Sequence, residues 1–135
     1  LIARGIDLEK YNQEVGSTIS YTTEWFAPYT YWAESNSIFN RSYSNEDYKS
    51  PISRGEMAQI LNRFLVYKKI DTQIGDSSYT DLSNIDSDVQ IAISIVSEAG
   101  LVKGYDDGSF KLDNNMTRAE IATIIYRYNE LLNKI

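Results

Sequence analysis

The strongest constraint on the fold is a seven-residue phrase that the chain contains twice. Residues 52–58 read ISRGEMA and residues 116–122 read MTRAEIA. The arginines of the two copies lie 118 − 54 = 64 residues apart, and a phrase repeated at a fixed spacing indicates an internal structural repeat. The chain is therefore expected to contain at least two copies of one supersecondary unit.

Each copy of the phrase has the form of a helix start. The pattern S/T-x-x-E is a capping box, and apolar residues before the cap and at the fourth helical position complete a hydrophobic staple. Beyond each cap, apolar residues recur at the spacing of one helix face, which predicts amphipathic helices beginning at Arg54 and Arg118. The predicted caps and their partners are Ser53 with Glu56 and Thr117 with Glu120.

Arginine is an unexpected residue at the first helical position. A cation at this end opposes the helix dipole, at a cost of about 0.3–1 kcal/mol at an exposed site. One interpretation is a salt bridge to a nearby carboxylate, or a solvated side chain. The other is an anion site, because the free amides of a helix start and a guanidinium both favour a carboxylate or a phosphate. Both interpretations apply equally to Arg54 and Arg118.

Composition excludes several classes of function. The net charge of the 135-residue chain is −6, and no basic stripe is present, so nucleic acid is not an expected partner. The sequence contains neither Cys nor His, which excludes disulfides, thiolate sites, Ser-His-Asp catalysis and most zinc sites. No apolar run approaches 18 residues, so no membrane insertion is expected. The sequence shows no signal-peptide pattern. Because its first residues fall in the middle of the repeat pattern, the chain is expected to be a fragment of a longer protein.

The repeat predicts an all-α fold of helix–loop–helix units packed side by side. One first helix is expected over residues 24–35, capped by Thr22 or Thr23 and ending before a left-handed Asn36. The matching helix is expected to start near Ser87, through a capping box with Gln90, and to end before a left-handed Gly100. Loops of about 16 residues (37–52 and 101–116) then lead to the second helices, and connections of this length are often functional.

Four regions follow from this pattern. Residues 1–20 are expected to be the tail of a preceding repeat and a connector, residues 21–70 a degenerate repeat, residues 71–78 a linker, and residues 79–135 a well-formed repeat. In the second loop, Gly104, Asp107 and Gly108 suit tight turns, while Phe110 and Leu112 are expected to enter the core. The first loop contains no glycine.

Aromatic residues form a second, less specific signal. The chain has 11 Tyr and 2 Trp, and such side chains stack on sugars but more commonly fill cores. Trp25 and Trp32 are therefore expected in the core, with sugar stacking by Trp25 as the alternative.

Residues 79–132 resemble an S-layer homology repeat. The resemblance rests on Tyr79-Thr80-Asp81, on the run from Gly100 to Phe110, and on the phrase Met116 to Ala122. A weaker copy covers residues 21–67, where the Gly-x-x-Asp-Gly loop is missing, and residues 1–5 resemble the end of a third copy.

The resemblance implies both a fold and a function. Such modules usually come as three repeats that form a compact pseudo-trimer, and they anchor secreted proteins to the bacterial cell wall or S-layer without covalent attachment. Their usual ligand is a secondary cell wall polysaccharide with a pyruvate ketal, or another glycan linked to peptidoglycan, and it lies in grooves between repeats. The implied ligand-binding residues are Arg118, Arg54, Glu120, Glu56, Gly104, Asp107 and Gly108, with Trp25 as a further candidate.

Alternatives to glycan anchoring come from other protein classes. The degenerate first loop favours a structural repeat that assembles with other repeats or binds a protein partner without glycan affinity. A glycosidase using paired carboxylates is not excluded by composition, but no two acids stand in a suitable context. The acidic runs near Asp81 and Asp113 lack the spacing of a calcium loop, so neither a metal nor a cofactor is expected.

Overall fold

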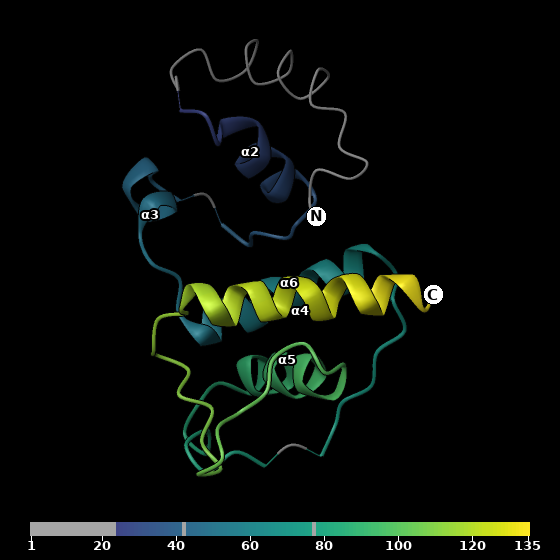
Figure 1. The fold of residues 1–135 in the computed structure, drawn as a ribbon. Helices are drawn as coiled ribbons and strands as arrows, with labels where there is room; N and C mark the ends of the chain where they lie inside the picture. The colour runs from purple at the N-terminus through teal and green to yellow at the C-terminus, as the bar shows by residue number, and fades with distance from the viewer. Residues whose placement is uncertain (1–23, 42, 77) are drawn as a thin grey trace. The chain divides into compact units, whose positions relative to one another are not determined.

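The structure is a computed structural model that describes residues 24–41, 43–76 and 78–135. These residues form five helices and no β-strand, which confirms the predicted all-α fold (Figure 1). The chain divides into two compact units, Leu1–Ser50 and Pro51–Ile135. No helix in the described ranges is long and apolar enough to cross a membrane.

The first unit contains helices α2 (Ala27–Ser35) and α3 (Asn45–Lys49). The N-cap of α2 is Phe26, which makes no side-chain cap bond, so the predicted threonine cap is wrong; Thr22 and Thr23 themselves lie outside the described residues. Pro28 falls in the first turn, where its missing N–H is tolerated. The buried apolar side chains of this unit include Phe26, Trp32 and Ile38.

The loop after α2 differs from the prediction in two ways. Asn36 has a φ of −103°, and the left-handed conformation falls instead on Ser37, with a φ of 57°. The loop also contains α3, whose capping box joins Ser44 and Asp47. Because α3 has only five residues, it was too short to produce an apolar period in the sequence.

The second unit contains α4 (Arg54–Tyr67), α5 (Ser87–Glu98) and α6 (Arg118–Asn133). The predicted starts at Arg54 and Arg118 are confirmed, with Ser53 and Thr117 as N-caps. At α6 both bonds of the capping box form. At α4 only the bond from the Glu56 amide to Ser53 forms, so the predicted return bond from the Glu56 side chain is absent.

Helix α5 begins at the predicted residue but without the predicted cap. Asp86 is its N-cap, and the Gln90 side-chain amide donates to the Ile85 carbonyl at 2.7 Å rather than completing a box with Ser87. At the other end, Gly100 has a φ of +72°, which confirms the predicted left-handed residue after the helix.

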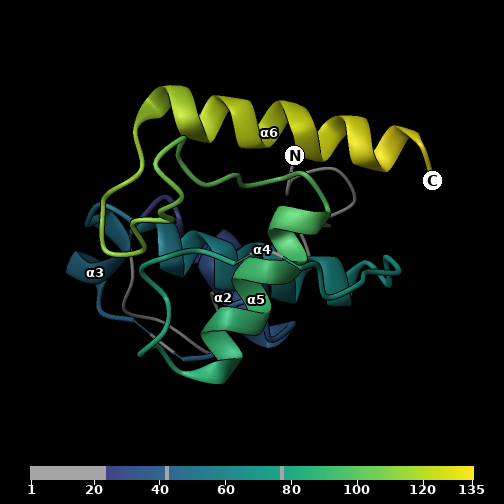
Figure 2. The same ribbon diagram turned by 90° about the horizontal axis from the view of Figure 1, so that it is seen from below.

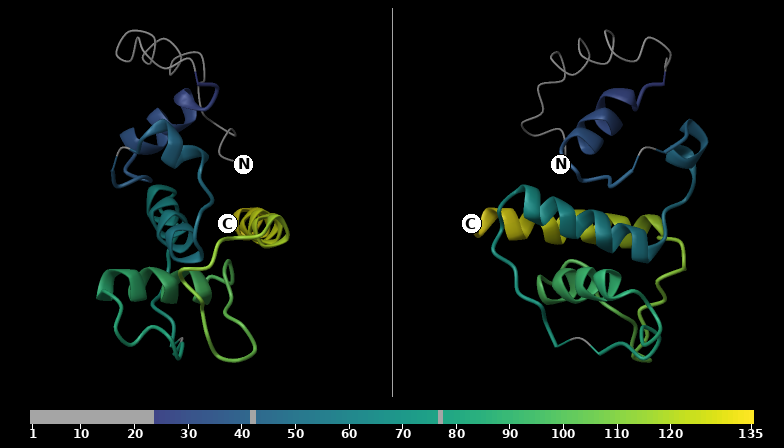
Figure 3. Two further views of the ribbon diagram at one scale, coloured as in Figure 1. Left: turned by 90° about the vertical axis from the view of Figure 1, so that its left-hand side faces the viewer. Right: turned by 180° about the vertical axis from the view of Figure 1, so that it is seen from behind.

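The core of the second unit lies where α5 and the loop after it meet α4. Helix α5 packs against α4, and Ala58, Leu65, Ile93 and Phe110 are fully buried. Helices α4 and α6 begin at the same end of the unit and run in the same direction (Figure 1 and Figure 3). The Phe64 and Tyr128 rings join them, with centroids 5.3 Å apart.

The loop between α5 and α6 connects the two helix starts. Figure 2 shows it leaving α5 and returning to the beginning of α6. Ser53 and Asn115 form an isolated antiparallel bridge beside the two caps. Phe110 enters the core as predicted, whereas Leu112 is half-buried against Gly55.

The division into compact units does not follow the predicted repeats. Helix α4, assigned to the repeat 21–70, belongs to the second unit. A repeat is defined by its sequence, whereas a compact unit is defined by its contacts, so the units do not test the repeat boundaries. The four predicted regions therefore stay a prediction. The tail 1–20 lies outside the described residues.

Replacing Gly100 with alanine is expected to destabilise the protein by about 1–2 kcal/mol. No neighbouring atom would contact the added methyl, so the cost comes from the left-handed backbone alone. Replacing Ser37 with glycine removes the same strain and should not destabilise. Urea unfolding measures both effects, and a Gly100→Ala variant as stable as the parent would contradict the left-handed assignment.

Candidate functional site

Arg54 is buried in the second unit with only 3% of its surface exposed. Its guanidinium makes three bonds: Nε donates to the Phe110 carbonyl, Nη1 to the Glu120 carboxylate and Nη2 to the Lys103 carbonyl, each at 2.8 Å. The Tyr105 and Phe110 rings lie 4.6 and 4.9 Å from the guanidinium carbon, within the range of cation–π attraction. For Arg54 the salt-bridge interpretation is therefore correct.

The amides at the start of α4 are also bonded within the protein. The Arg54 amide donates to the Asn114 carbonyl at 2.9 Å, the Gly55 amide to the Leu112 carbonyl at 2.8 Å, and the Glu56 amide to the Ser53 hydroxyl at 3.1 Å. The start of α4 thus has no free amides for an anion, although the predicted contact of Arg54 itself with a ligand stays a prediction.

Glu120 links the start of α6 to Arg54. One carboxylate oxygen accepts from Arg54 and from the Tyr105 hydroxyl at 2.9 Å, and the other accepts from the Thr117 amide at 2.8 Å. The Thr117 amide bond, followed by the Tyr105 and Arg54 interactions, holds the pKa of Glu120 below its usual range against the opposing effect of burial. Glu120 is therefore a carboxylate that positions Arg54 and Tyr105.

The glycine loop has the tight turns that its sequence predicted. Gly108 has a φ of +82°, and Asp107 accepts bonds from the Ser109 amide and hydroxyl at 3.0 and 2.6 Å. A methyl on Gly104 would lie 2.2 Å from a Tyr79 ring carbon, so no side chain fits there. The Asp81 carboxylate, which lies outside the loop in sequence, accepts bonds from the amides of Phe110 and Lys111 at 2.9 and 2.8 Å and so holds the end of the loop in place.

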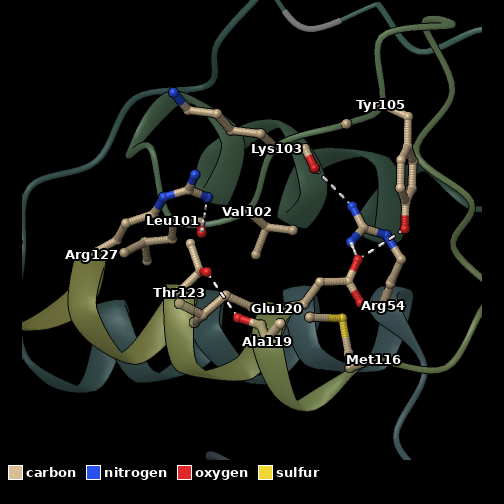
Figure 4. A pocket seen from close by; sticks show the side chains of 12 residues that line it. Arg54, Leu101, Val102, Lys103, Tyr105, Met116, Ala119, Glu120, Thr123 and Arg127 are labelled. Carbon is tan, nitrogen blue, oxygen red and sulfur yellow. Dashed lines mark hydrogen bonds and ion pairs between the residues drawn. The ribbon is translucent and has the colours of Figure 1, made fainter.

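Arg54, Gly104, Tyr105 and Glu120 border a groove of about 300 Å³ (Figure 4). Arg54, Tyr105 and Glu120 lie at one end in Figure 4, and Arg127 lies at the other. The first turns of α6 form one wall and the backbone after α5 the opposite wall. The twelve lining residues are Arg54, Leu101, Val102, Lys103, Gly104, Tyr105, Met116, Ala119, Glu120, Thr123, Ile124 and Arg127.

The predicted site residues fall into two groups. Arg54, Glu120 and Gly104 line the groove, whereas Arg118, Glu56, Asp107 and Gly108 do not. Arg118 is exposed at the start of α6, and Glu56 is half-buried in the first turn of α4. Whether any of these residues contacts a ligand stays a prediction.

Trp25 belongs to the first unit and is not a core residue. Its surface is 80% exposed, and its ring meets Phe26 edge-on at 5.7 Å, so the expected core placement is wrong for Trp25. For Trp32, which is 5% exposed, the core placement is confirmed.

Sequence reasoning missed two cations of the groove, Lys103 and Arg127. A signal for Arg127 existed, because residues 1–4, 60–63 and 124–127 align at the same 64-residue spacing between the last two copies, and each of the three segments ends in arginine. Lys103 carries no such signal, because its place beside the groove depends on how the loop after α5 folds.

Comparison with known proteins gives a family match for the part of the chain that contributes most of the residues lining this groove. Residues 78–122 match the family model of the S-layer homology domain. This match confirms the resemblance of the second half of the chain to an S-layer homology repeat. No solved structure matches the chain significantly.

Two curated relatives come from Acetivibrio thermocellus. The chain is 38% identical over 77 residues to cell surface glycoprotein 1, an alignment covering 57% of this chain and 3% of that protein. It is 50% identical over 44 residues to a cellulosome-anchoring protein, covering 33% of this chain and 10% of that protein. The chain thus spans only a small part of either relative.

Replacing Arg54 with alanine is expected to destabilise the second unit by about 2–4 kcal/mol, because it removes a buried, charge-assisted network and leaves two carbonyls and Glu120 without their donor. Arg54→Lys should recover only part of this loss, because lysine lacks the planar fork. The matched control is Arg118→Ala, at the equivalent exposed position, with an expected effect within about 0.5 kcal/mol. Denaturant unfolding measures these differences, and equal effects of the two alanine variants would contradict the role of Arg54.

Replacing Glu120 with glutamine is expected to reduce the acid sensitivity of the fold. Since the pKa of Glu120 is lower in the folded state, its ionised form stabilises the fold above the ordinary value of 4.5, and this contribution disappears as the pH falls through the lowered pKa. Glu120→Gln should cost about 1–2 kcal/mol at pH 7 and much less at pH 3.

The control for this pH dependence is Glu130→Gln, which alters an exposed glutamate on the same helix. Unfolding by urea between pH 3 and pH 7 measures the difference. A stability gap between Glu120→Gln and the parent that stays constant with pH would show that the Glu120 charge does not stabilise the fold.

Proposed function

We propose that this chain is a non-catalytic anchoring module that binds an anionic secondary cell wall polysaccharide in the groove between α4, α6 and the loop after α5. The observation that carries the proposal is the charge of this groove. Arg54 is neutralised by Glu120, but neither Lys103 nor Arg127 has a carboxylate partner among the described residues. A groove with two uncompensated cations on a chain of net charge −6 suits an anionic ligand.

The start of α6 adds to the attraction for an anion. Glu120 and Ile121 donate their amides to Thr117, while the amides of Arg118 and Ala119 have no partner within the described part of the chain. Ala119 lines the groove, so the positive end of a 16-residue helix borders the ligand. This helix start keeps the anion-binding features that the start of α4 lacks.

The groove also has the mixed surface that a sugar requires. Apolar side chains of Leu101, Val102 and Ile124 offer contacts to the faces of a sugar ring. The Thr123 hydroxyl donates to the Ala119 carbonyl at 2.8 Å, so its oxygen remains able to accept from a ligand hydroxyl.

The comparisons support a role at the cell surface. The matched family is named for surface layers, and the names of the two relatives describe a cell surface glycoprotein and a cellulosome-anchoring protein. We therefore place this chain outside the cell, at a bacterial wall or S-layer, with a pyruvate ketal as the proposed source of the ligand's negative charge. The contact of Arg118 with such a ligand is part of this proposal, in a second site at the exposed start of α6.

A hydrolytic function fits the groove poorly. Glu120 is the one acidic residue among its twelve lining residues, whereas hydrolysis of glycosides normally uses a pair of carboxyl groups. In addition, the lowered pKa of Glu120 keeps it ionised, which is unsuitable for a general acid.

Exposed apolar side chains on α6 favour one competing function. Ile125 and Tyr126 are 49% and 65% exposed, and Ala122 beside them is exposed as well. Such a surface suits packing against another repeat or a protein partner. A structural repeat without glycan affinity is therefore the second candidate.

Co-sedimentation with bacterial cell walls distinguishes the two candidates. The chain should bind walls that carry their secondary polysaccharide, lose binding when this polymer is extracted, and bind less well at high salt. Arg118→Ala should weaken binding if α6 contributes a second contact. Undiminished retention on extracted walls, or self-association without any wall material, would overturn glycan anchoring in favour of the structural repeat.

A further inference from the structure

We propose that Arg127 is the residue that binds the carboxylate of the ligand within the groove, whereas Arg54 keeps the groove in shape. This inference rests on the proposed function and adds to it, because it assigns the charge recognition to a side chain that neither the repeated phrase nor the family comparison indicated. The assignment follows from which guanidinium donors remain available in the groove.

Arg54 has little capacity left for a ligand. Each of its three nitrogens already donates a 2.8 Å bond, its charge is paired with Glu120, and two aromatic rings flank it. A ligand carboxylate at this end would also approach Glu120, and two carboxylates in one site repel each other. The Arg54 end of the groove therefore suits uncharged hydroxyl groups of a sugar.

Arg127 has the opposite environment. Its one bond within the described residues is long, from Nη1 to the Leu101 carbonyl at 3.3 Å, and this bond directs the side chain toward the groove while leaving most of its donors unused. The side chain is half-buried, and its guanidinium has no carboxylate partner in the described ranges. A guanidinium held in one direction with a free edge is well suited to bidentate binding of a carboxylate.

Neighbouring groups add to the attraction at this end. Figure 4 shows the Lys103 side chain extending away from Arg54, toward the side of the groove where Arg127 lies. Thr123 lies one turn before Arg127 on the same face of α6, next to the floor formed by Leu101 and Ile124. The charged groups of the groove are thus Arg54, Glu120, Lys103 and Arg127, and Glu120 is bonded at the far end.

The spacing of the two ends suits a sugar bearing an acidic substituent. Glu120 and Arg127 are seven residues apart on α6, which corresponds to about 10 Å along the helix. A ligand can therefore place hydroxyl groups near Glu120 and its carboxylate on Arg127, with a ring against the apolar floor. This polarity predicts one orientation of the glycan in the groove.

The test measures binding of the whole chain to a purified pyruvylated wall polysaccharide by isothermal titration, beside the same polymer after mild acid has released its pyruvate. Arg127→Gln should weaken binding to the intact polymer at least about 10-fold, because it removes the charge-assisted bonds, and Arg127→Lys should recover only part of the loss. Both variants should bind the pyruvate-free polymer as weakly as the parent does. Lys134→Gln, which removes an exposed cation at the end of the same helix, is the matched control and should bind like the parent.

Three outcomes separate this inference from the proposed function. Loss of affinity by Arg127→Gln for the intact polymer alone supports the inference, provided that circular dichroism shows the parent fold. Equal loss for both polymers, or no loss for either, overturns the role of Arg127 and leaves glycan anchoring in place. Failure of the parent chain to bind the intact polymer overturns the proposed function itself.

Discussion

The buried guanidinium of Arg54 joins three segments of the second unit that are distant in sequence. It lies at the start of α4, bonds to the carbonyls of Lys103 and Phe110 in the loop after α5, and pairs with Glu120 at the start of α6. A buried cation is costly unless its donors are satisfied, so this network requires the loop and both helix starts to adopt one arrangement. The Glu120 carboxylate also accepts bonds from Tyr105 and from the Thr117 amide, so the ion pair is linked to both the loop and the cap of α6.

The same network separates two arginines that the sequence presents as equivalents. Arg54 and Arg118 share a cap, a helix position and a glutamate three residues beyond the cap, yet one is buried and the other exposed. The difference lies in what packs against each helix start, since the loop after α5 covers the start of α4 alone within the described residues. Because the charge of Arg54 is neutralised inside the fold, we propose that recognition in the groove falls to Arg127 and the start of α6.

Local sequence patterns predicted the elements, whereas long-range contacts decided the roles. Caps and apolar spacing located the starts of α4 and α6, and Gly100 and Phe110 took their expected places, because these features depend on a few neighbouring residues. The cap of α5, the left-handed Ser37 and the short helix α3 were missed, since several residues could fill each position at similar cost. The partners of Arg54 and the exposure of Trp25 are tertiary properties, so no local pattern could supply them. Arg127 could have been predicted from the sequence, because Arg4 and Arg63 occupy the matching positions of the other two repeats.

The most direct test of the site is a titration of the isotopically labelled chain with a pyruvylated wall oligosaccharide, followed by two-dimensional NMR of the backbone amides. A ligand in the groove should shift the amides of Lys103, Gly104 and Ala119 and the guanidinium signal of Arg127. The Arg54 guanidinium, held by Glu120 and two carbonyls, should change little. Shifts confined to other surfaces, such as the region of Trp25, or an unchanged spectrum at saturating oligosaccharide, would contradict glycan binding in this groove.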